Sequence, residues 1–126
     1  MAAADATWDV VVVGASFAGA ACALAARRAG LRVCVLERKR DPGMRLHTTG
    51  IIVREAAEDT ALARIPPALV RRVEGVRLYA PNLRCMDLQS PGYYFLSTDT
   101  PAVMRWLAGE LERAGVDLRL MQSFTD

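Results

Sequence analysis

The spacing of hydrophobic positions predicts a strand, a helix and a second strand in the first part of the chain. Residues 9–13 are an acid followed by four valines, a β-branched run typical of a strand covered on both faces. Small and apolar residues recur at helical spacing over about residues 17–29, and residues 31–36 are again apolar except for Arg32. This order predicts a parallel βαβ unit.

The predicted helix has a smooth face of small residues. Ala18, Ala21 and Ala25 recur on one side together with Leu24, and we expect this face to let the helix lie close to the sheet. Gly30 follows at the position where a residue in the left-handed conformation commonly ends a helix.

The middle of the chain changes to a period of two. A helix is predicted over about residues 54–64, before two prolines, and residues 67–72 are interpreted as one more helical turn. Three short alternating runs follow, each separated from the next by turn residues. We therefore expect an antiparallel β-meander, inserted after the βαβ unit. Its strands are residues 76–80, 83–88 and 93–96.

The last part returns to helical spacing. Thr100 and Pro101 are a cap and a first-turn proline, and Gly115 ends the predicted helix. Residues 116–121 predict a third parallel strand, which would be the outer one, beyond the second. The apolar stripe of this helix consists of Val103, Met104, Leu107 and Leu111.

These elements predict an α/β fold, in which a Rossmann-like βαβ unit carries an inserted antiparallel β-meander and the sheet is incomplete. Residues 1–50 would be the βαβ unit and the loop that follows it, residues 51–98 the helix and meander, and residues 99–126 the last helix and strand.

Charge and composition exclude several partners. A net charge of +2 is too small to indicate nucleic acid or an anionic membrane. Residues 10–26 carry no charge, but Asp9 precedes them where a signal peptide has Lys or Arg, and Gly14, Ser16 and Gly19 interrupt them. We therefore expect no membrane span and a cytoplasmic protein. Residues 1–7 form an Ala-rich leader.

The metal-ligating residue types give no pattern. Cys22, Cys34 and Cys85 share no metal or redox spacing, and we expect buried, reduced thiols of a cytosolic protein. His47 is the single histidine, which excludes a His-based metal cluster within this chain. No metal site is expected.

The glycine-rich segment between the first strand and helix is a variant of the G-x-G-x-x-G fingerprint. Gly14 would make the tight turn, and Gly19 would allow close packing of helix on strand. Ser16 replaces the middle glycine with a small residue whose hydroxyl can donate to a phosphate oxygen. We expect a pyrophosphate at this helix N-terminus. The full segment is Gly14, Ala15, Ser16, Phe17, Ala18 and Gly19, in which Phe17 is expected to pack.

An acid stands at the end of the second strand. Glu37 lies 23 residues after Gly14, and a carboxylate there accepts hydrogen bonds from ribose hydroxyls and repels a 2′-phosphate. The alternative is an accidental glycine turn with a surface Glu. Arg38, Lys39, Arg40 and Arg45 follow. They are either a solvated basic loop, or Arg38 flanks the adenosine while Arg45 neutralises phosphate or approaches the flavin.

Further segments extend this pattern over nearly the whole chain. They are Glu37-Arg38-Lys39, Pro42-Gly43, Thr48-Thr49-Gly50-Ile51, Gly75-Val76-Arg77-Leu78-Tyr79, Gly92-Tyr93-Tyr94, Met104-Arg105-Trp106-Leu107 and Ala114-Gly115-Val116. Together with the glycine turn they resemble the geranylgeranyl reductase-like branch of the p-hydroxybenzoate hydroxylase-like, FAD-dependent oxidoreductases. The resemblance implies that residues 1–126 are the N-terminal portion of an FAD-binding domain, with a Rossmann-like FAD/NAD(P)-binding βαβ unit and a flavin-side loop over residues 1–50. It also implies FAD as cofactor and places His47, Thr48 and Thr49 near the flavin.

The chain departs from that branch in three respects. It has His47-Thr48-Thr49 where the reductases often have Cys-Gly-Gly, and Thr100 where an Arg is frequent. A later Gly-Asp motif has no counterpart, so we expect an N-terminal piece of a longer protein. His47 is either a polar loop residue or a residue beside the isoalloxazine ring that donates a proton near neutral pH.

Three functions follow from these patterns. The first is an FAD-dependent oxidoreductase whose reduced flavin acts on an apolar organic small molecule, by double-bond reduction or monooxygenation, with NAD(P)H as candidate electron donor. The second is an inactive or incomplete dinucleotide-binding fragment. The third is an NAD-binding dehydrogenase domain.

Overall fold

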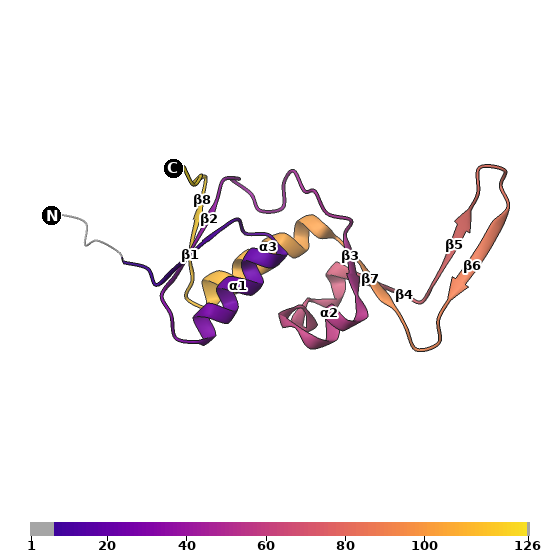
Figure 1. Cartoon of the computed structure of the whole chain (residues 1–126), viewed down its shortest axis with the longest axis horizontal. Coiled ribbons are helices and arrows are strands. Elements are labelled where there is room, and N and C mark those ends of the chain that lie inside the picture. The colour runs from indigo at the N-terminus through magenta and orange to yellow at the C-terminus, as the bar shows by residue number, and fades with distance from the viewer. Residues whose placement is uncertain (1–6, 126) are drawn as a thin grey trace. The chain divides into compact units, whose positions relative to one another are not determined.

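The computed structural model describes residues 7–125 and divides the chain into two compact units. Among the described residues, the first unit combines residues 7–46 with residues 101–125, and the second contains residues 47–100 (Figure 1). Most of the Ala-rich leader lies outside the described residues.

The first unit is a parallel sheet with two helices. Its strands β1 (Val10–Val13), β2 (Val33–Glu37) and β8 (Asp117–Leu120) are hydrogen-bonded in the order β1-β2-β8. Helices α1 (Phe17–Arg28) and α3 (Thr100–Arg113) connect to these strands and lie on the same side of the sheet (Figure 1). The α/β class, the βαβ unit and the outer position of the third strand are confirmed.

The core of this unit lies between the helices and β2. The predicted stripe of α3 is confirmed, because Val103, Met104, Leu107 and Leu111 are all buried. The central strand β2 contributes Val33, Cys34 and Val35, which are also buried, to the core of the same unit. Residues on β1 are less covered: Val11 is 50% exposed and Val13 61% exposed on this edge strand.

The prediction of which side of α1 faces the sheet is wrong. Ala18, Ala21 and Ala25 are exposed, whereas Ala20, Ala23 and Leu24 are buried. The reason is the close contact of Gly19 with the Gly14 carbonyl, which turns residues 19, 20, 23 and 24 towards the sheet.

The second unit holds two separate antiparallel sheets. Strands β3 (Ile51–Val53), β7 (Phe95–Thr98) and β4 (Val70–Val73) form one sheet in the order β3-β7-β4. Strands β5 (Gly75–Tyr79) and β6 (Cys85–Gln89) form a hairpin of their own. Along the chain, β3 is followed by helix α2 (Arg54–Asp59) and by 3₁₀ turns at Ala61–Arg64 and Pro67–Leu69, and then by β4.

The predicted three-strand meander is therefore wrong in its pairing. The third run, β7, pairs with β3 and β4 and not with β6. Neither β3 nor β4 was expected, and the helical turn predicted over residues 67–72 ends at Leu69 before β4 begins. The helix predicted over residues 54–64 breaks at Thr60, whose backbone is extended and whose hydroxyl caps the Leu62 N–H at 3.1 Å.

The apolar run of residues 10–26 is shared between β1 and α1. Within residues 7–125, no helix combines the length and apolar character that crossing a bilayer requires. The expectation of buried cysteines is right only for Cys34, since Cys22 and Cys85 are exposed. Burial raises the pKa of the Cys34 thiol above its ordinary value.

We predict that Gly19→Ala lowers the free energy of unfolding by about 3 kcal/mol, because the new Cβ would overlap the Gly14 carbonyl oxygen. Gly109→Ala in α3 is the matched control. There the Cβ would meet only the end of the flexible Arg113 side chain at 3.2 Å, so stability should rise by about 0.5 kcal/mol. Urea denaturation measures both. Equal midpoints for the two variants would contradict the close contact.

Candidate functional site

The glycine turn joins β1 to α1 and leaves the start of the helix open. Gly14 has a positive φ of 97°, which side chains other than glycine rarely adopt, and its N–H donates to the Leu36 carbonyl at 2.7 Å. A Cβ at Gly14 would meet nothing within 4 Å, so space remains above the turn. The first N–H groups of α1 face this region without intrahelical partners, as at any helix N-terminus.

The carboxylate of Glu37 is bonded to this turn. Glu37 is only 5% exposed, and its Oε2 accepts a hydrogen bond from the Ala15 N–H at 3.0 Å. Its Oε1 accepts from the Lys39 N–H at 2.9 Å. Glu37 is therefore not a surface residue, so this part of the alternative is wrong. The carboxylate instead connects the glycine turn to the end of β2, a contact that spacing alone did not reveal.

The remaining turn residues differ in exposure. Ser16 is the N-cap of α1 with an extended backbone, and its exposed hydroxyl makes no capping hydrogen bond to the described helix. Phe17 is half-buried and Ala18 is exposed. Ala15 is buried and takes part through its backbone N–H. The Ser16 hydroxyl is thus the side-chain donor at the mouth of the turn.

The basic segment after β2 is held by its neighbours. Lys39 Nζ donates to the Pro42 carbonyl at 3.1 Å, while Arg38 is exposed. Asp41 accepts from the Gly43 N–H at 2.8 Å and pairs with Arg105 of α3, whose Nη2 lies 2.7 Å from Oδ2 and whose Nε lies 3.0 Å from Oδ1. The Arg105 guanidinium, helped by the Gly43 N–H, holds the pKa of Asp41 below its usual value.

Arg45 is exposed and has an unusual positive φ of 50°. The three residues predicted to lie near a flavin, His47, Thr48 and Thr49, are exposed and belong to the second unit. Their position beside a cofactor therefore stays a prediction.

Two threonines hold the end of that loop inside the second unit. The Thr98 hydroxyl donates to the Gly50 carbonyl at 3.0 Å, and the Thr98 N–H reaches the same oxygen at 2.9 Å. The hydroxyls of Thr98 and Thr100 lie 2.9 Å apart. Gly50 has a φ of 70°, and a Cβ there would lie 2.5 Å from the Thr100 hydroxyl oxygen. Thr100 thus has a local structural role.

The arrangement of the glycine turn suits a dinucleotide phosphate. Helix N–H groups, an open space above Gly14 and a donor hydroxyl on Ser16 favour a phosphate, and buried Glu37 favours hydroxyl groups. Across residues 7–125 no group of three His, Cys, Asp or Glu side chains is placed to hold a metal ion.

Comparison with known proteins gives a family match over residues 9–125, to the FAD dependent oxidoreductase family. A probable electron transfer flavoprotein-quinone oxidoreductase, YgcN of Escherichia coli (strain K12), is 34% identical over 86% of this chain and 27% of its own length. Digeranylgeranylglycerophospholipid reductase 2 of Methanopyrus kandleri is 29% identical over 90% of this chain and 28% of its own length.

The fold also matches solved structures. A geranylgeranyl bacteriochlorophyll reductase-like protein from Thermoplasma acidophilum superposes with a TM-score of 0.79 and 22% identity, covering 90% of this chain and 30% of that protein. The chain thus spans between 27% and 30% of the length of these three proteins.

We predict that Glu37→Gln lowers the free energy of unfolding of the flavin-free chain by about 1–3 kcal/mol. The amide NH₂ of the new side chain would face one of the two N–H donors that the carboxylate now accepts, from Ala15 and Lys39. Glu112→Gln, at an exposed position of α3, is the control and should change stability by less than about 0.5 kcal/mol. Chemical denaturation that finds both variants alike would refute the bridging role.

We predict that Arg105→Ala raises the pKa of Asp41 towards its ordinary value, because its main hydrogen-bonding partner is lost. A lowered folded-state pKa stabilises the protein above the pKa of the unfolded chain, and this stabilisation disappears as pH falls through the folded-state pKa. As the pH falls, protonation of Asp41 should therefore lower the free energy of unfolding less in the Arg105→Ala variant than in the wild-type protein.

Titration of the Asp41 side-chain carbon by NMR measures the effect. Arg77→Ala is the control, because it removes the partner of Asp87 and should leave Asp41 unchanged. An Asp41 titration that is identical with and without Arg105 would contradict this account.

Proposed function

Because the chain belongs to the FAD-dependent oxidoreductase family, we propose that its first unit binds the ADP half of FAD within a flavin-dependent oxidoreductase. The observation that carries this proposal is the hydrogen bond between the buried Glu37 carboxylate and the Ala15 N–H of the glycine turn. It brings the groups that favour a ribose and those that favour a pyrophosphate to one edge of the sheet.

The pyrophosphate would lie over Gly14 at the start of α1. The open space above Gly14, the helix N–H groups and the Ser16 hydroxyl support this placement. Phe17, Ala18 and Gly19 would shape the turn without contributing charge. Arg38 would flank the adenosine, and Arg45 would neutralise phosphate.

The ribose would bind at Glu37 without displacing its existing partners. Each carboxylate oxygen has two lone pairs, and the structure uses one on each for Ala15 and Lys39. In the proposed complex, the second lone pair of each oxygen would accept a ribose hydroxyl. A 2′-phosphate would meet this negative charge, which disfavours NADP at this site. The family match likewise favours FAD over an NAD-binding dehydrogenase domain.

When bound, FAD supplies hydride or electron transfer, and the chain supplies binding and orientation. We propose an apolar organic small molecule as substrate, acted on by double-bond reduction or monooxygenation, with NAD(P)H as electron donor. The reductase among the relatives supports the first reaction. His47, with Thr48 and Thr49, would lie near the flavin and exchange a proton there. A cytoplasmic location agrees with three cysteines that form no pair.

The test is whether the purified protein carries flavin absorbance or gains it with added FAD. We predict that Gly14→Val lowers FAD affinity at least about tenfold, because its side chain would occupy the space over the turn. Gly30→Val is a matched control, since Gly30 also has a positive φ, of 84°, and open surroundings. It imposes the same backbone strain away from the phosphate path.

The visible absorbance of bound flavin, titrated with FAD, measures both variants. A colourless wild-type protein that ignores added FAD would overturn the proposed function. Equal loss of affinity in the two variants would show that strain, and not the phosphate path, decides the result.

A further inference from the structure

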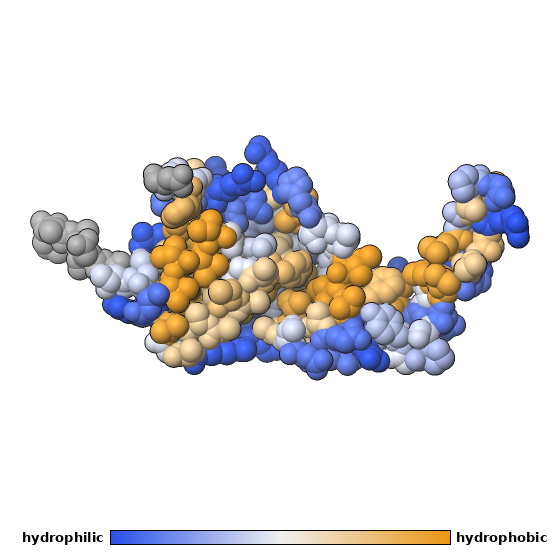
Figure 2. All heavy atoms as spheres, viewed as in Figure 1, coloured by the Kyte–Doolittle hydropathy of each residue, from blue (hydrophilic) through white to orange (hydrophobic). Residues whose placement is uncertain are grey.

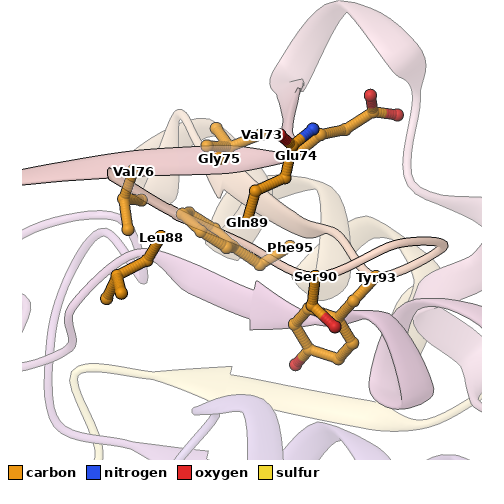
Figure 3. A pocket seen from close by; sticks show the side chains of 9 residues that line it. All are labelled: Val73, Glu74, Gly75, Val76, Leu88, Gln89, Ser90, Tyr93 and Phe95. Atoms are coloured by element: carbon orange, nitrogen blue, oxygen red, sulfur yellow. The ribbon is translucent and has the colours of Figure 1, made fainter. Parts of the chain in front are cut away.

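Apart from the glycine turn and Glu37, the described chain offers an apolar cavity and a basic loop. The open cavity lies at the base of the β5–β6 hairpin, where Val76, Leu88 and Phe95 are among its lining side chains (Figure 3). Nothing in the described chain shows what covers it, so no ligand is assigned to it. The basic loop, residues 38–45, follows β2 in the first unit, and strongly hydrophilic residues lie along it in Figure 2.

The basic loop begins at the carboxylate proposed to bind ribose. The Lys39 N–H donates to Glu37 Oε1 at 2.9 Å, and the Lys39 carbonyl accepts from the Met121 N–H at 3.3 Å. At its other end, Lys39 Nζ donates to the Pro42 carbonyl at 3.1 Å. A displacement of the turn at Pro42 would therefore reach the N–H group that orients the Glu37 carboxylate.

The turn of the basic loop is fastened to α3 by an ion pair. Arg105 donates twice to the Asp41 carboxylate, through Nη2 at 2.7 Å and Nε at 3.0 Å. Asp41 also closes the turn itself, because its Oδ1 accepts from the Gly43 N–H at 2.8 Å and its carbonyl accepts from the Met44 N–H at 3.1 Å. One residue thus shapes the turn and joins it to the helix.

Gly43 gives the same turn a second contact with α3. Pro42 and Gly43 are buried, and a Cβ at Gly43 would lie 2.6 Å from the Pro101 carbonyl oxygen and 3.0 Å from Arg105 Cζ. The turn lies this close to the first turns of α3 because Gly43 has no side chain. A close approach and an ion pair therefore hold the turn in one place.

The basic side chains extend from a backbone that is already held. Arg38, Arg40 and Arg45 are exposed, whereas Lys39 is half-buried and bonded to the turn. A loop that is ordered before a ligand arrives loses less conformational entropy on binding. The contacts with α3 would therefore favour binding even though α3 itself lies outside the proposed cofactor contacts.

We propose that Asp41, Gly43 and Arg105 are positioning residues for the ADP half of FAD, which they affect through the basic loop and Glu37. This assignment rests on the proposed function, and none of the three residues is proposed to touch the cofactor. The side chains of Arg105 and Asp41 are 53% and 29% exposed. Exposed ion pairs contribute weakly, so losing this one should lower FAD affinity about fivefold.

Three variants separate positioning from simple charge attraction. Asp41→Ala removes a negative charge, Arg105→Ala removes a positive charge and Gly43→Ala changes no charge. Positioning predicts that FAD affinity falls about fivefold in all three. Attraction to the anionic pyrophosphate alone predicts a gain in Asp41→Ala, a loss in Arg105→Ala and no change in Gly43→Ala.

Isothermal titration calorimetry of the purified protein, at one ionic strength, measures FAD and ADP. ADP should lose the same factor as FAD, because the loop is proposed to act on the half that the two ligands share. Arg113→Ala is the matched control, since it breaks an ion pair with Glu110 on the same helix and should change either affinity less than about twofold. Circular dichroism checks the folding of each variant.

Hydrogen exchange of the flavin-free protein gives a readout that needs no cofactor. Arg105→Ala should speed exchange of the Gly43 and Lys39 N–H groups at least about threefold, because the turn that holds both is loosened. Arg113→Ala should leave both rates unchanged.

Several results would overturn the proposal. They are opposite changes of FAD affinity in Asp41→Ala and Arg105→Ala, unchanged affinity in Gly43→Ala, an equal loss in Arg113→Ala, and a loss for FAD without one for ADP. Unchanged exchange at Lys39 in Arg105→Ala would likewise contradict the connection to Glu37. A wild-type protein that binds neither FAD nor ADP would instead refute the proposed function.

Discussion

The close contact between Gly19 and the Gly14 carbonyl determines how the first unit is built. Because no side chain fits between them, α1 starts directly against the end of β1. This contact decides which face of α1 is buried and sets Ser16 at the mouth of the turn. Glu37 then connects the turn to β2 through the Ala15 N–H, so the backbone around the site is fixed from two sides.

Local sequence patterns predicted the first unit well, with one instructive error. The strands and the apolar stripe of α3 could be predicted from the sequence, because their apolar residues contrast with polar neighbours at a regular period. In α1 that contrast is missing. Alanines occur on every side of the helix, so their spacing cannot indicate which side faces the sheet. The prediction that Ala18, Ala21 and Ala25 face the sheet is therefore wrong. The deciding contact is between backbones, which a hydrophobic pattern does not record.

The second unit was harder to predict because its pairing is non-local. Strand β7 lies between β3 and β4, which precede it by more than twenty residues in the chain. The alternation in Val76, Leu78, Met86 and Leu88 identified the hairpin but not which strands adjoin it. The hydroxyl contacts of Thr98 with Gly50 and the cavity beneath the hairpin depend on that pairing, and no local motif signals them.

The site itself separates residues that the fold requires from residues that a ligand requires. The positive φ of Gly14 and the contact of Gly19 are needed by the turn even in the absence of any ligand. A glycine motif alone therefore indicates a βαβ turn more strongly than it indicates a dinucleotide. Ser16 differs, because its exposed hydroxyl makes no capping bond to α1 within the described chain.

Glu37 has a structural role that the turn shows directly, since its two carboxylate oxygens accept backbone N–H groups, and a ligand role that we propose. The spacing of Glu37 from Gly14 predicted only the proposed ligand role, because that spacing is shared with known sites. Its structural role depends on a buried N–H that no sequence pattern marks. Ser16, Glu37 and the family match therefore support the proposed binding of FAD more specifically than the glycines do.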